Sequence, residues 1–570
     1  MTPDRRTFTL AALAAAGAGY LGARDALGAQ APASSSALGQ PGSALPTPPA
    51  SAPWPLGNGE SPASQFQPYP GGTGALLERL VRERGVAAFA RTTMTPRAWT
   101  GALPSSSEDL AFLPAHRLAA LLRARTISST RLTGIYLARL QQLNPRLNCV
   151  VTLVEAQALA EARQADAEIA AGRYRGPLHG LPYGLKDLFS TRGVRTTWGV
   201  PDFKDRVIDE DAEIVVRLRD AGAVLVAKLS TGIFAQNDQW FGGRTNNPWN
   251  LEQGSSGSSA GPASAVAAGC VAFAIGTETQ GSIVSPAIRC GITALRPTFG
   301  RVSRYGGMVL AWSQDRVGPM CRTAEDCAMV FGAIHGVDEK DPSTVTTPFQ
   351  FDRRIDLVRL RVGVDPDAPP ALVAQLRAMG LAPRPIGPRP VVPGAGGGLG
   401  VESAAAFDDY VRRKAAAIGL DLAALPPTSR PTPPASADNP MAPADWNPRF
   451  VNGRVVPAVD FLQSQRRRQA LVASWGEFMK DLDLFIGGPT ADVSAHAQTG
   501  HPCVVLPYTF DVPPSRSSGA RAAADAPQSP AVAQPVCATI VGALYADDVI
   551  LGVAHRFQEV TDFHARRPTL

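Results

Sequence analysis

Two short runs of small and apolar residues, each preceded by a helical pattern, constrain the fold more than any other feature of this sequence. Residues 211–220 have helical periodicity and lead through Gly222 into the apolar run 223–227. A second run, 271–275, follows a stretch of small residues that begins at Pro262. Unbroken apolar runs are typical of strands that are buried on both faces. The sequence therefore predicts an α/β fold with a central mixed sheet covered by helices on both faces.

Other patterns place further elements along the chain. Apolar residues recur at helical spacing from Leu132 to Leu143, and Ser128 or Ser129 is a candidate N-cap. The remaining predicted helices are 155–170, 404–420 and 460–480, the remaining strand is 482–486, and Pro- and Gly-rich loops are predicted at 384–400, 426–448 and 511–535. No internal repeat is present, and one large domain over 76–570 fits this pattern better than two independent domains.

The first 31 residues have the pattern of a twin-arginine export signal. Arg5 and Arg6 are followed by Phe8 and a weakly apolar run, with small residues for cleavage at 29–31. An amphipathic helix or a membrane anchor is the alternative, although the apolar run is too short to span a bilayer comfortably. Residues 32–75 are rich in Ala, Ser, Pro and Gly and predict a flexible linker. We expect a periplasmic or extracellular protein without stable membrane insertion once the signal is removed.

The composition argues against nucleic-acid binding and metal chemistry. A net charge of +6 comes from 55 basic and 49 acidic residues, but no Lys/Arg run resembles a nucleic-acid-binding arm. The seven cysteines form no CxxC pair and the seven histidines no HExxH pattern, so we expect no metal, no cofactor and no nucleic-acid partner. An oxidising compartment permits disulfides, but an odd number of cysteines leaves at least one thiol without an internal partner.

Lys186 is a candidate general base. It lies in the apolar, glycine-punctuated segment 180–189. Burial penalises the ammonium form and lowers the pKa of a lysine, which makes the neutral amine available as a base. A solvated lysine, or one paired with the neighbouring Asp187, is the alternative and is favoured when this segment is taken alone.

Two Gly/Ser-rich segments lie next to the predicted strand 271–275. Residues 254–261 would form a flexible linker in isolation, but here they precede a predicted helix start at Pro262 and so place hydroxyls at a helix N-terminus. Residues 276–286 leave the carboxyl end of the strand, where α/β folds hold active sites. Backbone N–H groups of Thr279, Gln280, Gly281 and Ser282 are candidates for an oxyanion hole. A phosphate-binding loop is the alternative, but no Gly-Lys-Ser/Thr or GxGxxG motif accompanies it.

Together these segments resemble the amidase signature family. The family's motifs correspond here to Gly257-Ser258-Ser259 and to residues 180–187 and 276–287, with supporting matches at 244–250, 296–303, 318–320 and 499–502. The resemblance covers about residues 110–335 and resumes weakly over about 500–565. It implies the amidase signature fold and a Ser-Ser-Lys amidohydrolase.

The resemblance also implies a role for each residue. Ser282 is the expected nucleophile and forms an acyl-enzyme, Ser258 relays the proton, and Lys186 is the base. Family members hold the relay serine after a cis peptide, here Gly257–Ser258. The expected reaction cleaves a linear carboxylic amide, of a small molecule or a peptide, to an acid and ammonia or an amine, as a simple amidase does. A monomer or a homodimer is expected.

Three departures from the motif bear on specificity. Gln280 replaces a glycine, Val284 replaces an arginine and Glu278 replaces an aspartate, and this form is closest to the peptide-amidase branch. The loss of the arginine argues against an acidic substrate group. Four aromatic residues could line an apolar pocket, but burial in the core is the favoured interpretation for each: Trp240, Phe241, Tyr305 and Trp312.

Two other functions are compatible with the motifs. One is that of the A-type subunit in a tRNA-dependent amidotransferase, which shares the motifs but works in a complex on charged tRNA. The other is that of a catalytically inactive secreted binding protein. The export signal and the lack of a basic run count against the first, and the intact Lys186, Ser258 and Ser282 count against the second.

Overall fold

The computed structural model describes residues 58–59, 62–396, 398–417, 419, 421–422, 450, 452–488, 493–512 and 533–570. Residues 56–570 form one compact unit, in agreement with a single domain. The predicted export signal 1–31, the Pro-rich segment 426–448 and most of the segment 511–535 lie outside the described residues. No helix within the described ranges is long and apolar enough to cross a membrane.

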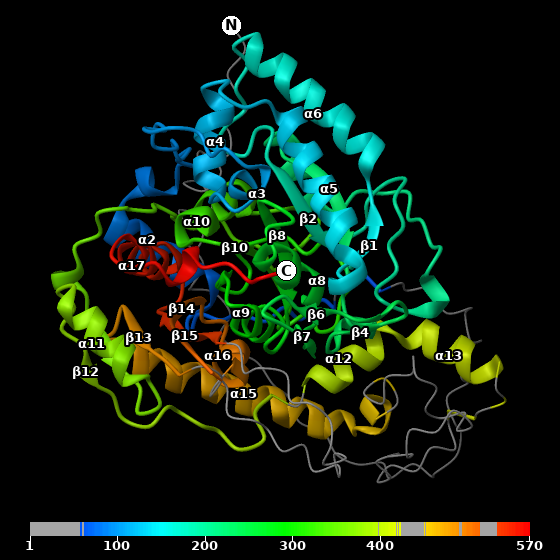
Figure 1. The fold of residues 1–570 in the computed structure, drawn as a ribbon. Coiled ribbons are helices and arrows are strands. Elements are labelled where there is room, and N and C mark those ends of the chain that lie inside the picture. Colours follow the sequence, from blue (N-terminus) through cyan, green and yellow to red (C-terminus); the bar gives the residue numbers. More distant parts are fainter. Residues whose placement is uncertain are drawn as a thin grey trace, which may run out of the picture. The chain divides into compact units, whose positions relative to one another are not determined.

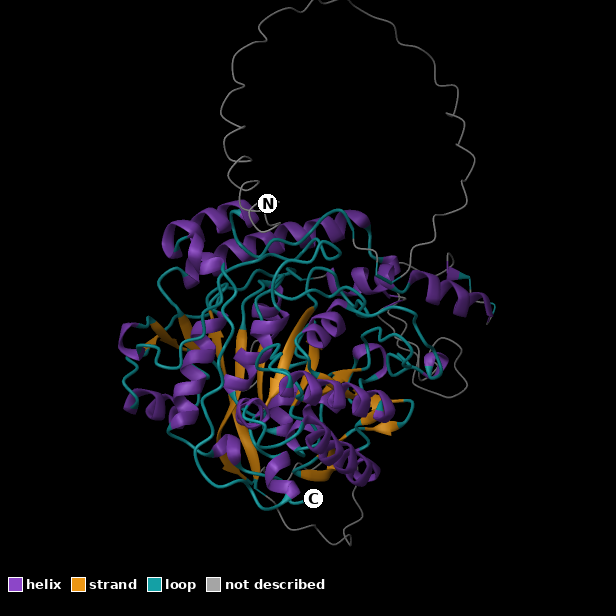
Figure 2. Ribbon diagram, turned by 90° about the horizontal axis from the view of Figure 1, so that it is seen from above, coloured by secondary structure: helices purple, strands orange, loops and turns teal. Residues whose placement is uncertain are grey.

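A mixed sheet of 11 strands runs through this unit (Figures 1 and 2). In spatial order its strands are β1 (Val150–Leu153), β3 (Val224–Leu229), β2 (Pro182–Lys186), β8 (Phe273–Glu278), β10 (Arg316–Cys321), β9 (Thr293–Arg296), β14 (Cys503–Asp511), β15 (Gln534–Gly542), β13 (Leu484–Ile486), β11 (Val362–Val364) and β12 (Arg384–Pro385). Strand β2 is parallel to both β3 and β8, whereas β8 is antiparallel to β10. The predicted α/β class with a mixed sheet is confirmed.

Helices cover both faces of the sheet. They are α2 (Gly72–Arg84), α3 (Ser107–Ala111), α4 (Ala115–Arg123), α5 (Ser129–Leu147), α6 (Glu155–Ala170), α7 (Glu213–Asp220), α8 (Ala260–Ala267), α9 (Val284–Cys290), α10 (Ala324–Ile334), α11 (Pro370–Ala378), α12 (Gly398–Ala406), α13 (Asp408–Ala417), α15 (Ala458–Met479), α16 (Val493–Gln498) and α17 (Asp547–Glu559). Two short hairpins, β4 (Gln239–Trp240) with β5 (Gly243–Arg244) and β6 (Asn246–Asn247) with β7 (Asn250–Gly254), lie outside the large sheet.

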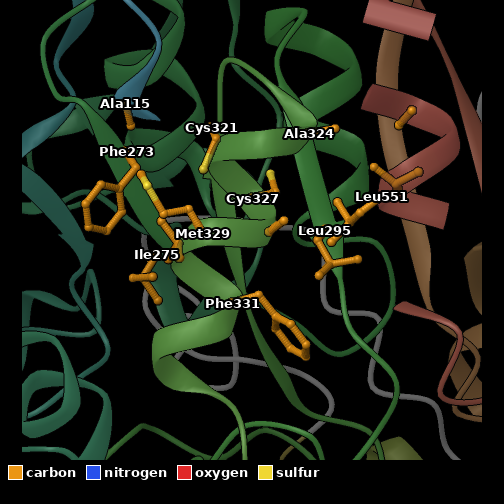
Figure 3. Close-up of a cluster of buried hydrophobic side chains, with 14 of the residues drawn as sticks. Ala115, Phe273, Ile275, Leu295, Cys321, Ala324, Cys327, Met329, Phe331 and Leu551 are labelled. Carbon is orange, nitrogen blue, oxygen red and sulfur yellow. The ribbon is translucent and has the colours of Figure 1, made fainter. Parts of the chain in front are cut away.

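Two hydrophobic cores follow from the alternation of side chains along the strands. Phe273 and Ile275 of β8 enter the core beneath α4, α7, α10 and α17, while Ala274 between them enters the core beneath α5, α8, α9 and α15. Figure 3 shows Phe273 and Ile275 beside Met329 of α10. Since buried apolar side chains cover both faces of the sheet, residues at the ends of β2 and β8 lie deep in the molecule.

Several predicted elements occur as expected because local signals dominate them. Helix α6 spans Glu155–Ala170, where the buried Ala158, Ala162 and Ala165 permit close packing. Ser128 caps α5 by accepting a hydrogen bond from the backbone N–H of Arg131.

Other boundaries differ. The segment 404–420 holds α13 and the last turn of α12, with a break at Phe407, instead of one helix. Helix α12 begins at Gly398, inside a segment predicted to be a loop. Helix α2 begins at Gly72, within residues 32–75, because its buried Leu76 and Leu80 pack onto the domain.

Candidate active site

Lys186 is the last residue of the central strand β2 and is completely buried. Its Nζ lies 2.8 Å from Ser258 Oγ, 3.0 Å from Ser259 Oγ and 2.8 Å from Thr277 Oγ1, with the carbonyl oxygen of Thr277 at 3.4 Å. Burial lowers the pKa of Lys186 well below its ordinary value, and the charges of Asp315 and Glu278 only partly oppose this. The amine is therefore surrounded by hydroxyl groups instead of carboxylates.

The neighbouring Asp187 does not pair with Lys186. Its carboxylate lies 3.1 Å from Lys228 Nζ in an ion pair whose side chains are both fully buried, and it accepts a hydrogen bond from the backbone N–H of Thr197 (3.0 Å). Burial lowers the pKa of Lys228 as well, but Asp187 opposes the shift from within hydrogen-bond distance. The alternative of a salt-bridged Lys186 is excluded.

Ser258 lies on the loop between β7 and α8. The Gly257–Ser258 peptide is cis, as the family resemblance implies. Gly257 has no room for a side chain, because an added Cβ would lie 1.8 Å from the carbonyl oxygen of Asn237. Asp238 holds the start of the loop by accepting the backbone N–H of Ser256 (3.0 Å). These contacts fix the peptide that places the Ser258 hydroxyl against Lys186.

Ser259 and Thr277 complete the surroundings of the amine, and neither is among the predicted site residues. Ser259 Oγ donates to the carbonyl oxygen of Thr277 (3.0 Å) and accepts from the Thr277 N–H (3.2 Å). The hydroxyl proton of Ser259 is thus used in the bond to Thr277, so the Ser259 oxygen can only accept a hydrogen bond from Lys186. Both residues lie in the Gly/Ser-rich segments, but the sequence carries no signal that distinguishes Ser259 from Ser258.

Ser282 lies on the loop between β8 and α9, half-buried at a cavity of ≈ 610 Å³. The cavity is lined mainly by polar residues: Ala235, Gln236, Asn237, Asp238, Gln239, Gly254, Ser256, Gly257, Thr279, Gln280, Ser282, Ser285, Arg289, Leu310 and Leu399. The carbonyl oxygen of Ser282 accepts the N–H of Ser259 (3.1 Å), which joins the two loops directly. Ser282 lines the cavity, whereas Lys186 and Ser258 are buried and are absent from its lining. Lys186 contacts Ser258 directly, but within the described residues no hydrogen bond joins the hydroxyls of Ser258 and Ser282.

Glu278 closes the loop that carries Ser282. One carboxylate oxygen accepts the N–H groups of Ile283 (2.8 Å) and Val284 (2.9 Å), and the other lies 2.9 Å from Arg296 in a fully buried ion pair. Burial raises the pKa of Glu278, but Arg296 and the backbone donors outweigh burial, so its pKa is lowered overall. The charged carboxylate holds residues 279–283 in a closed turn at the start of α9.

Side chains also hold the other side of this loop. Thr279 donates to Asp315 (2.6 Å), and Gln280 donates through Nε2 to Gln314 Oε1 (2.7 Å). None of the hydrogen bonds within the described part of the chain uses the backbone N–H groups of residues 279–282. These donors are free for a ligand in the cavity, as an oxyanion hole requires.

The aromatic residues near this region are not part of the cavity wall. Trp240, Phe241, Tyr305 and Trp312 are absent from the lining, and Trp312 and Trp240 are buried in the core. Among the described residues no group of His, Cys, Asp and Glu could hold a metal ion. All seven cysteines are buried and unpaired.

The chain is similar to known proteins over most of its length. The amidase family model matches residues 131–551. The A-type subunit of glutamyl-tRNA(Gln) amidotransferase from Methylococcus capsulatus is 35% identical over 486 residues, which cover 79% of this chain and 97% of that protein. The native peptide amidase of Stenotrophomonas maltophilia has a TM-score of 0.62 at 28% identity, covering 80% of this chain and 98% of that chain. An amidase family protein of Bacillus anthracis shares the fold with a TM-score of 0.66 at 23% identity, covering 82% of this chain and 95% of that chain.

Proposed function

The chain belongs to the amidase family, and from this premise we propose that it hydrolyses carboxylic amides with Ser282 as nucleophile, Ser258 as proton relay and Lys186 as base. The observation that carries the proposal is the buried amine of Lys186, which contacts two serine hydroxyls and no carboxylate. A lysine in that setting is neutral and has a lone pair that can accept a proton.

The hydrogen bonds support one direction for the proposed proton path. A neutral amine has two N–H donors and one lone pair. Its two N–H groups donate to the hydroxyl oxygens of Ser259 and Thr277. Ser259 can only accept from the amine, because its own proton is donated to the Thr277 carbonyl oxygen. The lone pair remains for the hydroxyl proton of Ser258 (2.8 Å). Ser258 in turn accepts the proton of Ser282 as Ser282 attacks the amide carbonyl.

The remaining steps follow from the same groups. Attack forms a tetrahedral intermediate, whose oxyanion binds the free N–H groups of Thr279, Gln280, Gly281 and Ser282. The proton held by Lys186 returns through Ser258 to the leaving nitrogen, which departs as ammonia or an amine. Water then attacks the Ser282 ester and gives a proton through Ser258 to Lys186. The same proton returns to the Ser282 oxygen as the ester bond breaks and the acid is released. No metal or cofactor enters any step.

The cavity wall supports a hydrophilic amide as substrate. Only Leu310 and Leu399 contribute large apolar side chains to it. Val284, which stands where the family motif has arginine, is buried and provides no cation for an acidic substrate group. We propose small polar amides or peptide amides as the substrate class, acted on by a simple amidase that works as a monomer or a homodimer.

The amidotransferase relatives support a second candidate function. This chain aligns with the Methylococcus capsulatus protein over 97% of that protein's length. A protein of this kind would act in a complex on charged tRNA. The candidate export signal at residues 1–31 and the absence of a basic run in the sequence favour the stand-alone hydrolase instead.

The test is a screen of the signal-free protein against a panel of simple and peptide amides, with Ser282→Ala as control. We expect release of ammonia or amine without ATP, glutamine or tRNA, and a loss of several orders of magnitude in kcat for the variant. A fluorophosphonate probe should label the parent but not the variant. Activity that requires tRNA and a partner would instead support the amidotransferase, and a parent that neither turns over amides nor reacts with the probe would support an inactive binding protein.

We also propose export by the twin-arginine route to the periplasm or the extracellular space. Arg5 and Arg6 support this proposal. Replacing both by lysine should leave the protein in the cytoplasmic fraction of a bacterial host, and unchanged export of that variant would refute the assignment.

A further inference from the structure

The loop that carries Ser282 has an anchor that the family motif does not supply. The motif has glycine at the position of Gln280, so it provides no side chain there. In this protein Gln280 is half-buried at the cavity wall, and its Nε2 donates to Gln314 Oε1 over 2.7 Å. The substitution therefore adds a contact between the loop and the turn that precedes β10.

Gln314 is placed to receive this one bond. Its side chain is completely buried, and within the described residues its Nε2 has no hydrogen-bond partner. Among those residues Gln280 is also the only group whose hydrogen bond reaches the Gln314 carboxamide. Burying a carboxamide is unfavourable unless it is hydrogen-bonded, so the bond to Gln280 is what offsets this cost.

The pair lies just beyond the paired ends of two strands. Strands β8 and β10 are antiparallel, and their pairing ends with Glu278 opposite Arg316. Beyond it the chain bends at residues 279–280 and forms a turn at 312–314. Two side-chain hydrogen bonds join these segments, from Thr279 to Asp315 and from Gln280 to Gln314. They hold the loop against the segment before β10 while its backbone N–H groups stay unpaired.

We propose that Gln280 and Gln314 form a clamp that positions the oxyanion loop by tying it to the turn that precedes β10. Gln280 is in this respect a positioning residue, because its side chain acts on the orientation of the N–H groups of its own loop. The inference rests on the proposed function of Ser282. It goes beyond that function by assigning a role to a residue pair at a position where the family motif has only glycine.

The expected effect is a selective loss in the chemical step. Gln280→Met keeps the volume of the side chain and removes the hydrogen bond. The N–H donors remain, so the loss in kcat should be smaller than the roughly 10²–10³-fold loss caused by removing a donor itself. We expect a decrease of roughly 10-fold in kcat, with little change in KM and no change in the pH at which activity rises, because Lys186 is untouched.

The test is a double-mutant cycle on the signal-free protein with Gln280→Met, Gln314→Met and the combination. If the two residues act as one clamp, each single variant loses about the same factor and the double variant loses no more. The control is Gln141→Met on α5, which removes an exposed glutamine bond to Glu155 (3.1 Å) and should leave kcat unchanged. The rate at which a fluorophosphonate labels Ser282 supplies a second readout that does not depend on the choice of amide.

Each outcome decides the proposal. An unchanged kcat and labelling rate in Gln280→Met, a change in KM alone, or losses that multiply in the double variant would overturn the clamp while leaving the amidase intact. Gln314→Glu keeps an acceptor for Gln280 and should recover part of the loss of Gln314→Met, which separates the clamp from a packing defect. A parent without amide turnover and without labelling would overturn the proposed function itself, and the clamp with it.

Discussion

Replacing Lys186 by methionine tests whether the base is uncharged in the folded protein. Lys186 is completely buried and its pKa is lowered by burial, so the folded state holds fewer protons at this site than the unfolded chain does. For a lysine whose pKa is lowered on folding, stability is greatest above the ordinary value of 10.5 and decreases as the pH falls toward the folded pKa. The parent should therefore gain stability with rising pH relative to Lys186→Met.

The size of this effect follows from linkage. Holding the amine neutral at pH 7 costs at most about 5 kcal/mol, because each pH unit below 10.5 contributes about 1.4 kcal/mol. The variant escapes this cost but leaves the hydroxyls of Ser258 and Thr277 without their partner, at about 1–3 kcal/mol for each buried group. The stability of Lys186→Met at pH 7 should thus be close to that of the parent, while its kcat falls by at least about 10²–10⁴.

Urea unfolding of both proteins at pH 7, 8 and 9 measures the predicted slope. Other titrating groups are common to the two proteins and cancel in the difference between their free energies of unfolding. That difference should change by about 1.4 kcal/mol per pH unit in favour of the parent wherever the folded amine is neutral. A flat difference over this range would show that Lys186 is charged in the folded state, and the assignment of the base would be wrong.

Three further predictions concern the contacts around the site. Ser258→Ala should lower kcat by about 10²–10⁴, and Ser259→Ala by much less, because only the Ser258 proton is free to move to Lys186; steady-state rates on the best amide decide this. Glu278→Gln should lower the free energy of unfolding at pH 7 by about 3–5 kcal/mol, since it leaves Arg296 without its buried partner. The difference in free energy of unfolding between variant and parent should shrink as the pH falls through the lowered pKa of Glu278, because Glu278 of the parent is then protonated too. Equal stability of the two proteins at neutral pH would contradict this prediction. Lys228→Met should lower the free energy of unfolding in urea by about 3–5 kcal/mol, because it leaves the buried Asp187 without its partner, whereas Lys186→Met should not lower it by this amount. Similar losses for both variants would refute the distinction between the two buried lysines.

The elements that the sequence predicts correctly are those whose signals are local. Helix α6 occurs at its predicted bounds, since alanine spacing and a continuous helical pattern specify it without help from distant residues. The strand predicted at 223–227 is too short, because Lys228 resembles a polar end in the sequence, whereas its buried pair with Asp187 lets β3 continue to Leu229. Ion pairs between residues distant in sequence leave no periodic signal.

The site shows the same division. Lys186, Ser258 and Ser282 can be singled out because glycine and serine motifs mark their segments. The structure places Lys186 against Ser258 and places Ser282 in the cavity wall. The sequence gives no sign of Gln314, since its importance comes from the contact of the turn before β10 with the loop after β8, and a single sequence does not specify which segments meet. The favoured interpretation of the aromatic residues as core is confirmed for Trp240 and Trp312, which are buried. The sequence left a pocket role open because hydrophobic character alone does not distinguish a core from a cavity.

The geometry at the end of β2 explains why the buried Lys186 does not form an ion pair with the neighbouring Asp187. Lys186 is the last residue of β2 and Asp187 begins the turn that follows it. Their side chains contact different groups, although they are neighbours in sequence. Lys228 stands opposite Leu185 and shares the face of Asp187, which it neutralises. Glu278 is engaged by Arg296, and Asp315 is occupied by Thr279 and by backbone N–H donors. Each buried carboxylate near the amine thus has another partner, and Lys186 is left with hydroxyls and a carbonyl, the surroundings in which losing its proton is easiest.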